Sequence, residues 1–174
     1  MKITKIRQIS TTTGDDGKSR NFSNETLLKS DILFHLLGDL DELSSWIGLV
    51  YHFCLDENLK TIQTHLMRIA SEIATNPTSK AYELLHRVEN TEVEWIEAME
   101  TSLLQEQQLE SAFLLPGSER SLTGAYFDVC RTVARRTERT FVAFTIEKQR
   151  EDLLYAGKYL NRLSDLLFLF AGRK

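Results

Sequence analysis

The sequence predicts an all-α protein, a single antiparallel bundle of five helices. Two observations support this prediction: apolar residues recur at helical spacing in five segments, and the 174 residues include only two prolines, Pro77 and Pro116, both between those segments. Each predicted helix has one apolar stripe to bury, and helices with short connections pack antiparallel. No repeat, linker or convincing strand interrupts the pattern. We therefore expect one domain over residues 1–174, with an N-terminal loop segment (1–28) followed by the bundle (29–172).

The first two helices are predicted over about 29–54 and 58–75, and Asn76-Pro77 ends the second. The side of the first helix opposite its apolar stripe carries Asp41, followed at helical spacing by Ser45, Gly48 and His52. Asp41 is therefore placed to present a carboxylate from the helix surface. The alternative is an ordinary acidic residue that water solvates.

The remaining helices are predicted over about 80–107, 121–146 and 151–171. The third of the five is expected to bury an apolar stripe that includes Leu84, Leu85 and Val88. Before the fourth, residues 111–118 form an apolar run that ends in Pro-Gly, which is unusual because connections are normally polar. This run is either packed under the bundle or lines an apolar pocket.

Composition excludes several classes of function. The net charge of −4 argues against general affinity for nucleic acid. The two cysteines, Cys54 and Cys130, lack metal-type spacing and are predicted to be buried and reduced, and the four histidines also share no ligand spacing. The N-terminus has no signal peptide, and the longest apolar stretch, residues 166–171, is too short to span a bilayer. We expect a cytoplasmic protein, although an organellar leader removed beforehand would leave the same sequence.

The fourth helix carries the most informative pattern, RTVARRTER over residues 131–139. At 100° per residue, Arg131, Arg135, Glu138 and Arg139 fall within one arc of about 100°. Guanidinium groups stacked in this way repel one another. Such a row is tolerated where water solvates it, and it is useful where an anion or a carboxylate lies opposite. The helix alone leaves both interpretations open.

Two further segments carry polar groups. Residues 10–20, STTTGDDGKSR, place Gly14 and Gly17 among hydroxyl and carboxylate side chains, in a turn whose backbone N–H groups could hold phosphates. An ordinary N-terminal loop is the alternative. On the last helix, Asn161 and Asp165 share a polar side at i and i+4.

Taken together, these motifs resemble the PduO-type ATP:cob(I)alamin adenosyltransferases. The resemblance runs from about residue 11 to 172 and rests on the segments 11–19, 38–48, 113–117, 131–139 and 159–168. It implies a ferritin-like, cobalamin adenosyltransferase-like bundle that forms a homotrimer, with active sites between neighbouring subunits. The implied reaction transfers the 5′-deoxyadenosyl group of ATP to the cobalt of cob(I)alamin and releases triphosphate, with Mg²⁺ as a cofactor. A cobalamin reductase or a cobalamin-dependent acceptor enzyme are the implied partners.

The resemblance also implies roles for individual residues. Arg135, Asp41, Arg131 and Phe113 would take part in catalysis, and the last three would contact the corrinoid, with Arg131 paired to Asp41 across the subunit interface. Glu138 would be the position for Mg²⁺. The residues implied to bind ATP are Thr11, Thr13, Gly14, Asp15, Gly17, Lys18, Ser19, Arg135, Glu138, Arg139 and Asn161.

Two departures from the family pattern keep other functions open. Thr12 stands where the family usually has a lysine that reaches the triphosphate, and Asp128 stands where it usually has a histidine. A trimeric relative that binds corrinoid or nucleotide without transfer is therefore the alternative. A purely structural bundle is a third possibility, but it leaves Phe113, Asp41 and Asn161 at matching positions without an explanation.

Overall fold

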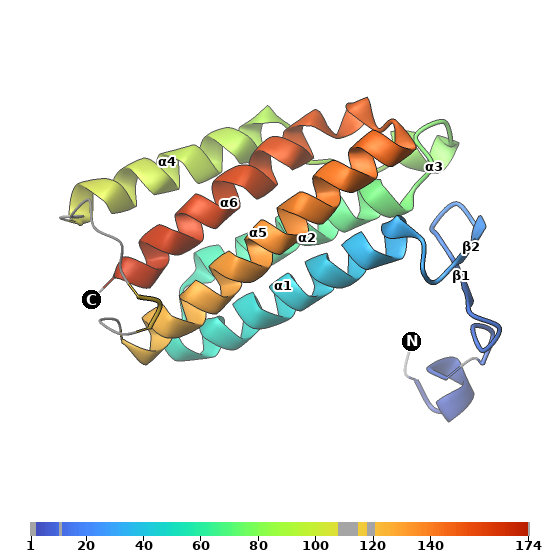
Figure 1. Ribbon diagram of the computed structural model, residues 1–174, viewed down its shortest axis with the longest axis horizontal. Coiled ribbons are helices and arrows are strands. Elements are labelled where there is room, and N and C mark those ends of the chain that lie inside the picture. The colour runs from blue at the N-terminus through green and yellow to red at the C-terminus, as the bar shows by residue number, and fades with distance from the viewer. Residues whose placement is uncertain (1–2, 11, 108–114, 118–120, 174) are drawn as a thin grey trace.

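Five long helices make up most of the protein (Figure 1). The computed structural model describes residues 3–10, 12–107, 115–117 and 121–173. The five helices lie side by side along the long axis of the molecule, which confirms the predicted bundle. They are α1 (Ile32–Cys54), α2 (Glu57–Ala74), α4 (Asn90–Glu106), α5 (Leu122–Lys148) and α6 (Leu154–Gly172).

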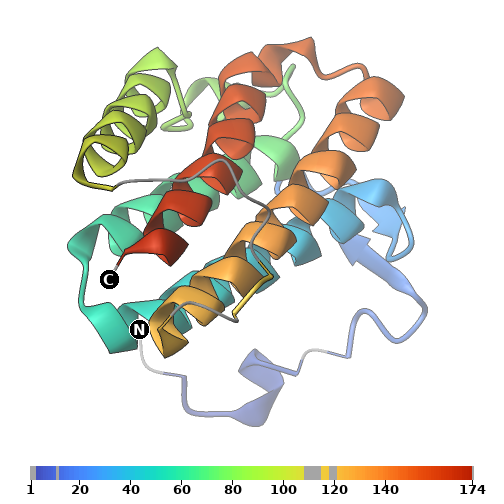
Figure 2. The same ribbon diagram turned by 60° about the vertical axis from the view of Figure 1, so that its left-hand side comes forward.

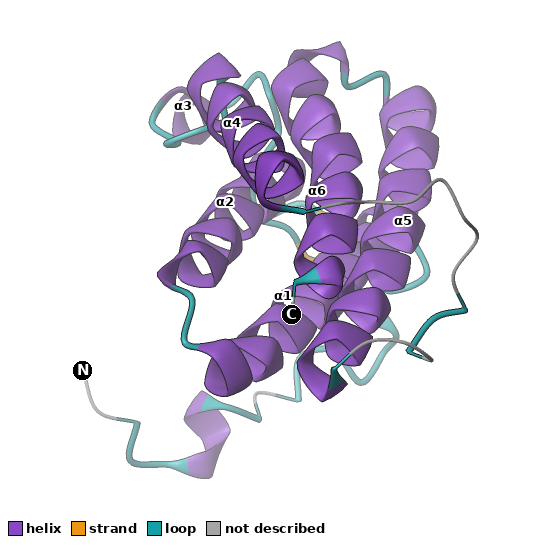
Figure 3. Cartoon of the chain, turned by 90° about the vertical axis from the view of Figure 1, so that its left-hand side faces the viewer, coloured by secondary structure: helices purple, strands orange, loops and turns teal. Residues whose placement is uncertain are grey.

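The core forms where the apolar stripes of these helices meet. Helix α5 packs against α1 and α6, α2 packs on α1, and α4 packs on α6 (Figures 2 and 3). The stripes predicted from the sequence are inside: Leu36, Ile47, Ile69, Phe144 and Leu163 are all almost completely buried. Within the described residues, no helix is both long enough and apolar enough to cross a membrane.

Local signals set where the long helices begin and end. The side chains of Asp31, Asp56 and Ser121 accept hydrogen bonds from backbone N–H groups in the first turns of α1, α2 and α5. Helices α1 and α5 each end on a left-handed residue that is not glycine, Leu55 with φ 52° and Gln149 with φ 53°. A 3-10 turn (Glu151–Leu153) then leads from α5 into α6.

The predicted continuous helix over 80–107 is wrong. A short helix, α3 (Lys80–Glu83), ends before Leu84, and α4 begins only at Asn90. Leu84, predicted to be inside, is 87% exposed. The break is stabilised by polar contacts: the Val88 N–H donates to Glu72 Oε1 at 2.8 Å, and Glu89 starts α4 through a reciprocal capping box with Glu92. Neither glycine nor proline marks this break in the sequence.

A small β-hairpin is the second difference from the sequence prediction. Strands β1 (Lys18–Arg20) and β2 (Thr26–Leu28) pair antiparallel, with Lys18 opposite Leu28. Three-residue strands are too short for alternation of apolar and polar residues to be visible in the sequence. A 3-10 turn (Ile6–Gln8) precedes the hairpin, which lies at the end of the bundle where α1 begins (Figure 1).

The cysteine prediction is half right. Cys130 is buried in α5, and burial raises the pKa of its thiol to about 12. Cys54, the last residue of α1, is exposed because the helix ends where its stripe leaves the core. Both are free thiols.

Candidate functional site

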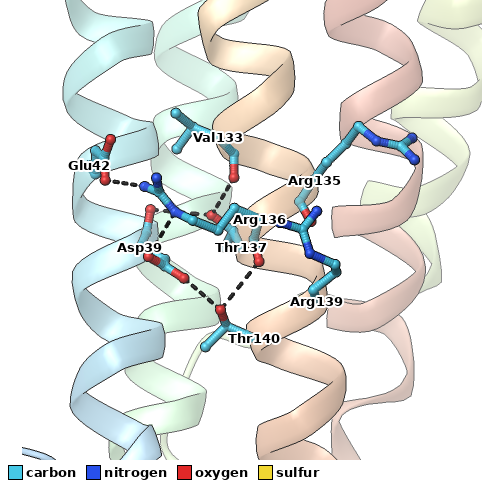
Figure 4. Close-up of polar contacts among 8 residues, drawn as sticks. All are labelled: Asp39, Glu42, Val133, Arg135, Arg136, Thr137, Arg139 and Thr140. Atoms are coloured by element: carbon cyan, nitrogen blue, oxygen red, sulfur yellow. Dashed lines mark hydrogen bonds and ion pairs between the residues drawn. The ribbon is translucent and has the colours of Figure 1, made fainter.

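The arginine row on α5 is exposed as a group of cations. Arg135 and Arg139 both lie on the surface, and neither forms an ion pair with any residue that the structure describes. Arg139 Nη1 instead donates to the backbone carbonyl oxygen of Arg135 at 3.1 Å, so the Arg139 side chain folds back along α5 (Figure 4). Two uncompensated guanidinium groups on adjacent turns repel each other, and an anion between them removes the repulsion.

Arg136, which the sequence analysis did not single out, fixes the direction of that row. Its Nε donates to Asp39 Oδ1 on α1 at 3.2 Å, and its Nη2 donates to Glu42. The Thr140 hydroxyl donates to Asp39 Oδ2 at 2.6 Å. Figure 4 shows Arg136 turned toward α1, whereas Arg135 and Arg139 extend to the other side of α5. Arg136 therefore lies on the α1 side of α5, and Arg135 and Arg139 lie on the other side.

Glu138 and Asn161 lie together across α5 and α6. Asn161 Nδ2 donates to Glu138 Oε1 at 2.7 Å, and Asn161 Oδ1 accepts from Arg162 Nη1 at 2.5 Å. These residues border a groove of about 630 Å³ between the two helices. Most of its exposed surface is apolar, although Arg150, Glu151 and Lys158 also line it. Phe141 lies so close to Gly157 that a Cβ there would be 3.0 Å from Phe141 Cε1. An apolar wall with a carboxylate and an amide at its edge suits a planar, hydrogen-bonding ligand.

The N-terminal loop forms a second hollow, of about 610 Å³. It includes most of the predicted phosphate-loop residues, namely Thr13, Gly14, Asp15, Lys18 and Ser19. Gly17 takes a left-handed conformation, φ 78°, and its carbonyl oxygen accepts from the Lys29 N–H at 2.8 Å. Thr12 is also left-handed, with φ 57°.

Lys29 is a second residue that the sequence analysis missed. Its ammonium group lies over Gly14, where a Cβ would be only 2.8 Å from Lys29 Nζ. Three cations, Lys18, Arg20 and Lys29, therefore line the same hollow, against one carboxylate, Asp15. The antiparallel register of the hairpin places Lys29 beside Gly17. Because the sequence analysis did not predict the two strands, it could not predict that Lys29 lies at this loop.

Asp41 and Arg131 are not paired within the chain. Arg131 Nε donates to Asp128 Oδ1 at 3.3 Å, and the Gly117 N–H donates to the same carboxylate at 3.3 Å. Asp41 is exposed on α1, has no hydrogen bond or ion pair with any described residue, and borders a groove of about 490 Å³ between α1 and α2. Phe113 and Thr11 lie outside the described residues.

Metal binding by a preformed protein cage has no support in the described part of the chain. No three histidine, cysteine, aspartate or glutamate side chains come together there in a way that could hold an ion. Glu138 offers one carboxylate beside the groove. Mg²⁺ often uses only one or two carboxylates and completes its coordination with phosphate oxygens and water, so a single glutamate fits a nucleotide-bound ion.

The sequence of this chain is similar to those of known adenosyltransferases. The sequence profile described as "Cobalamin adenosyltransferase" matches residues 9–173. The corrinoid adenosyltransferase MMAB of Mus musculus is 37% identical over 96% of this chain and 72% of its own length. The cobalamin adenosyltransferase of Cupriavidus metallidurans is 30% identical over 96% of this chain and 88% of its own length.

A solved structure agrees with the sequence relatives. A variant of the PduO-type ATP:corrinoid adenosyltransferase from Lactobacillus reuteri, complexed with cobalamin and ATP, superposes with a TM-score of 0.83 and is 27% identical. The alignment covers 94% of this chain and 91% of that one. A second variant of the same enzyme, complexed with ATP, gives a TM-score of 0.81 at 28% identity and covers 94% and 92%. This chain therefore belongs to the cobalamin adenosyltransferase family.

Proposed function

We propose that this protein transfers the 5′-deoxyadenosyl group of ATP to the cobalt of cob(I)alamin, forming adenosylcobalamin and releasing triphosphate. Support comes from the exposed pair Arg135 and Arg139, which lie within one turn of Glu138 on α5, in a chain of this family. Glu138 and Asn161 border the groove between α5 and α6. The groove would receive the nucleoside, and the two guanidinium groups would receive phosphates.

The reaction explains why cations are needed. The cobalt(I) electron pair attacks C5′ of ATP, a Co–C bond forms, and the C5′–O bond breaks so that its electron pair leaves with the triphosphate. Negative charge grows on the leaving group in the transition state. Preorganised guanidinium donors stabilise that charge more than they stabilise bound ATP, and this difference is what accelerates the step.

The N-terminal hollow would hold the rest of the triphosphate. Lys29 and Lys18 supply charge there, so Lys29 would do the work of the lysine that the family usually has at the position of Thr12. Glu138 would hold the Mg²⁺ that accompanies the nucleotide, and the ion would neutralise charge on the leaving triphosphate. In the homotrimer, the loop of one subunit would close the groove of its neighbour, and a reductase or an acceptor enzyme would deliver cobalamin or receive the product.

Phe113, Asp41 and Arg131 would form the corrinoid side of the site. An aromatic side chain that excludes the lower ligand leaves cobalt(II) four-coordinate and easier to reduce. Phe113→Ala should therefore slow the reaction that starts from cobalt(II) more than the reaction that starts from chemically reduced cobalt(I). Parallel anaerobic assays from the two starting states measure this difference, and equal losses in both would contradict the role.

An anaerobic absorbance assay tests the function itself. The protein is mixed with ATP, Mg²⁺ and chemically reduced cobalamin, and the loss of the cobalt(I) spectrum is followed together with triphosphate release. We expect one triphosphate for each adenosylcobalamin formed. Binding of ATP or cobalamin without conversion would instead support the non-catalytic relative, and no binding of either ligand would support a purely structural bundle.

A further inference from the structure

We propose that Arg150 is a positioning residue for ATP: it holds the end of α2 on which the N-terminal phosphate loop is anchored. The proposal rests on the proposed function, because it assigns a role in the binding of that substrate. Arg150 lies in the connection between α5 and α6, far in sequence from the loop, and is 6% exposed.

The guanidinium of Arg150 caps the C-terminus of α2. Its Nη2 donates to the carbonyl oxygen of Glu72 at 3.0 Å, and its Nη1 donates to that of Thr75 at 3.3 Å. Carbonyl groups in the last turn of a helix have no partner within the helix, and a cation there also interacts favourably with the helix dipole. The cap therefore fixes the backbone over residues 72–75.

Asp152 holds the guanidinium in place. Arg150 Nε and Nη2 donate to its two carboxylate oxygens, each at 2.9 Å, and the Tyr82 hydroxyl of α3 donates to the same carboxylate. The Arg150 guanidinium also lies 5.4 Å from the centre of the Tyr82 ring. A bidentate pair with a fixed carboxylate leaves the guanidinium little freedom.

The backbone that Arg150 fixes is also where the hairpin is anchored. The Phe22 N–H donates to the Ala74 carbonyl oxygen at 2.9 Å, and the Asn76 N–H donates to Ser23 Oγ at 2.8 Å. Asn76 Nδ2 adds a hydrogen bond of 2.8 Å to Glu25 Oε1. These contacts come from the turn that joins β1 to β2, and those strands carry Lys18 and lead into Lys29.

An unbroken series of contacts therefore joins the groove between α5 and α6 to the N-terminal phosphate loop. Arg150 borders the groove between α5 and α6, its guanidinium holds residues 72–75, and residues 74–76 hold the hairpin that bears the phosphate loop. The hairpin has only two short strands and gains little rigidity of its own. Its orientation thus depends on the end of α2, and the orientation of Lys29 depends on the hairpin.

Two variants of Arg150 test this role. Arg150→Lys keeps the charge but not the bidentate geometry, and Arg150→Met removes both. We expect the KM for ATP to rise roughly fivefold or more, whereas kcat at saturating ATP and the KM for cob(I)alamin stay within about twofold. Amide hydrogen exchange at Phe22 should accelerate in the same variants. An unchanged KM for ATP, or an equal loss in all three kinetic constants, would overturn the proposal.

Controls separate this role from general stability. Arg68→Met removes a different arginine that also joins two elements: Arg68 Nη1 on α2 lies 3.1 Å from Glu92 Oε1 on α4. This variant should leave the KM for ATP unchanged. Ser23→Ala removes the acceptor for Asn76 at the hairpin itself, without touching the core. Both changes act through one anchor. The effect of the double variant Arg150→Lys/Ser23→Ala on the KM for ATP, expressed as a free energy, should therefore be smaller than the sum of the two single effects. Additive effects would contradict the shared path.

The controls also keep the two hypotheses apart. If the wild-type protein does not convert cob(I)alamin, the proposed function fails, and hydrogen exchange at Phe22 still reports whether Arg150 holds the hairpin. If the wild-type protein converts cob(I)alamin and Arg150→Lys binds ATP normally, only the positioning role fails. Should Arg150→Met not fold, Arg150→Lys and Ser23→Ala decide the outcome.

Discussion

Arg135 and Arg136 are neighbours in sequence with opposite surroundings. Successive residues on a helix are 100° apart, so when Arg136 faces α1 and pairs with Asp39 and Glu42, Arg135 must face away from α1. The pattern of the sequence revealed the row that contains Arg135 but not the partner that aims it. Ion pairs between helices depend on how the helices pack, and periodicity within one helix contains no such information.

Arg135→Ala should reduce turnover strongly and leave the fold intact. Arg135 forms no ion pair with a described residue, so its removal costs little stability, whereas loss of one donor to the leaving triphosphate removes about 2–4 kcal/mol of transition-state stabilisation. The measurement is kcat from pre-reduced cobalamin, together with a thermal melt. By contrast, Arg136→Ala should lower stability, by at most about 1 kcal/mol because the pair with α1 is partly exposed. Turnover close to wild type for Arg135→Ala would reject its role at the phosphates.

Among the helices, the connection between α3 and α4 contacts a buried carboxyl group of α2. Glu72 at the end of α2 is 2% exposed and accepts a hydrogen bond from the Val88 N–H. Burial raises the pKa of Glu72 from 4.5 to about 7, although Arg87 and Arg150 nearby act in the opposite direction and Asp152 adds to the increase. Burial likewise raises the pKa of Glu100, on α4, to about 7.

Glu72 and Glu100 should therefore make the free energy of unfolding fall as the pH rises from about 4.5 to about 7, whereas His65, whose pKa burial lowers, acts in the opposite direction. In this window the folded protein keeps a proton on Glu72 that the unfolded chain has lost, so the unfolded state gains stability relative to the folded state as protons become scarce. Glu72→Gln should remove up to about 3 kcal/mol of this decrease, because one pKa unit corresponds to about 1.4 kcal/mol. A glutamine oxygen can still accept from Val88.

Denaturant unfolding at several pH values between 4.5 and 8 measures this effect. Glu72→Gln should flatten the curve and leave the contribution of Glu100, whereas a substitution at the exposed Glu83 should leave the curve as it is in the wild-type protein. If the decrease were as steep in Glu72→Gln as in the wild type, the buried carboxyl group would not be its source.

The sequence predicted the long elements better than the connections between them. Helices of 18 to 27 residues repeat the apolar pattern over several turns, so α1, α2, α5 and α6 were found at nearly their observed bounds. The break at Leu84 and the hairpin were missed because hydrogen bonds to Glu72 and Ala74, distant in sequence, determine them. Lys29 was missed with the hairpin.

Within the described residues of one chain, Asp41 has no hydrogen-bond or ion-pair partner, and Arg131 pairs with Asp128 alone. In a homotrimer the two would pair across the interface, so assembly would complete the site. Asp41→Asn, Arg131→Met and the double variant should each weaken the proposed trimer, and the double variant should be no weaker than the worse single variant. Sedimentation equilibrium measures this cycle. Strictly additive losses would show that the two residues do not pair.

The left-handed residues that end α1 and α5 are positions at which a substitution could make this protein more stable. Leu55 holds a left-handed conformation, φ 52°, with its side chain 66% exposed, so it suffers steric strain and contributes little burial in return. Glycine adopts this conformation without strain, and this gain outweighs the greater conformational entropy that glycine gives the unfolded chain. We therefore expect Leu55→Gly to raise the free energy of unfolding by about 0.5 kcal/mol or more in a denaturant titration. An unchanged or lower midpoint would contradict this. Selection removes proteins that fall below a working threshold and does not push the others to an optimum, so such positions remain open to engineering.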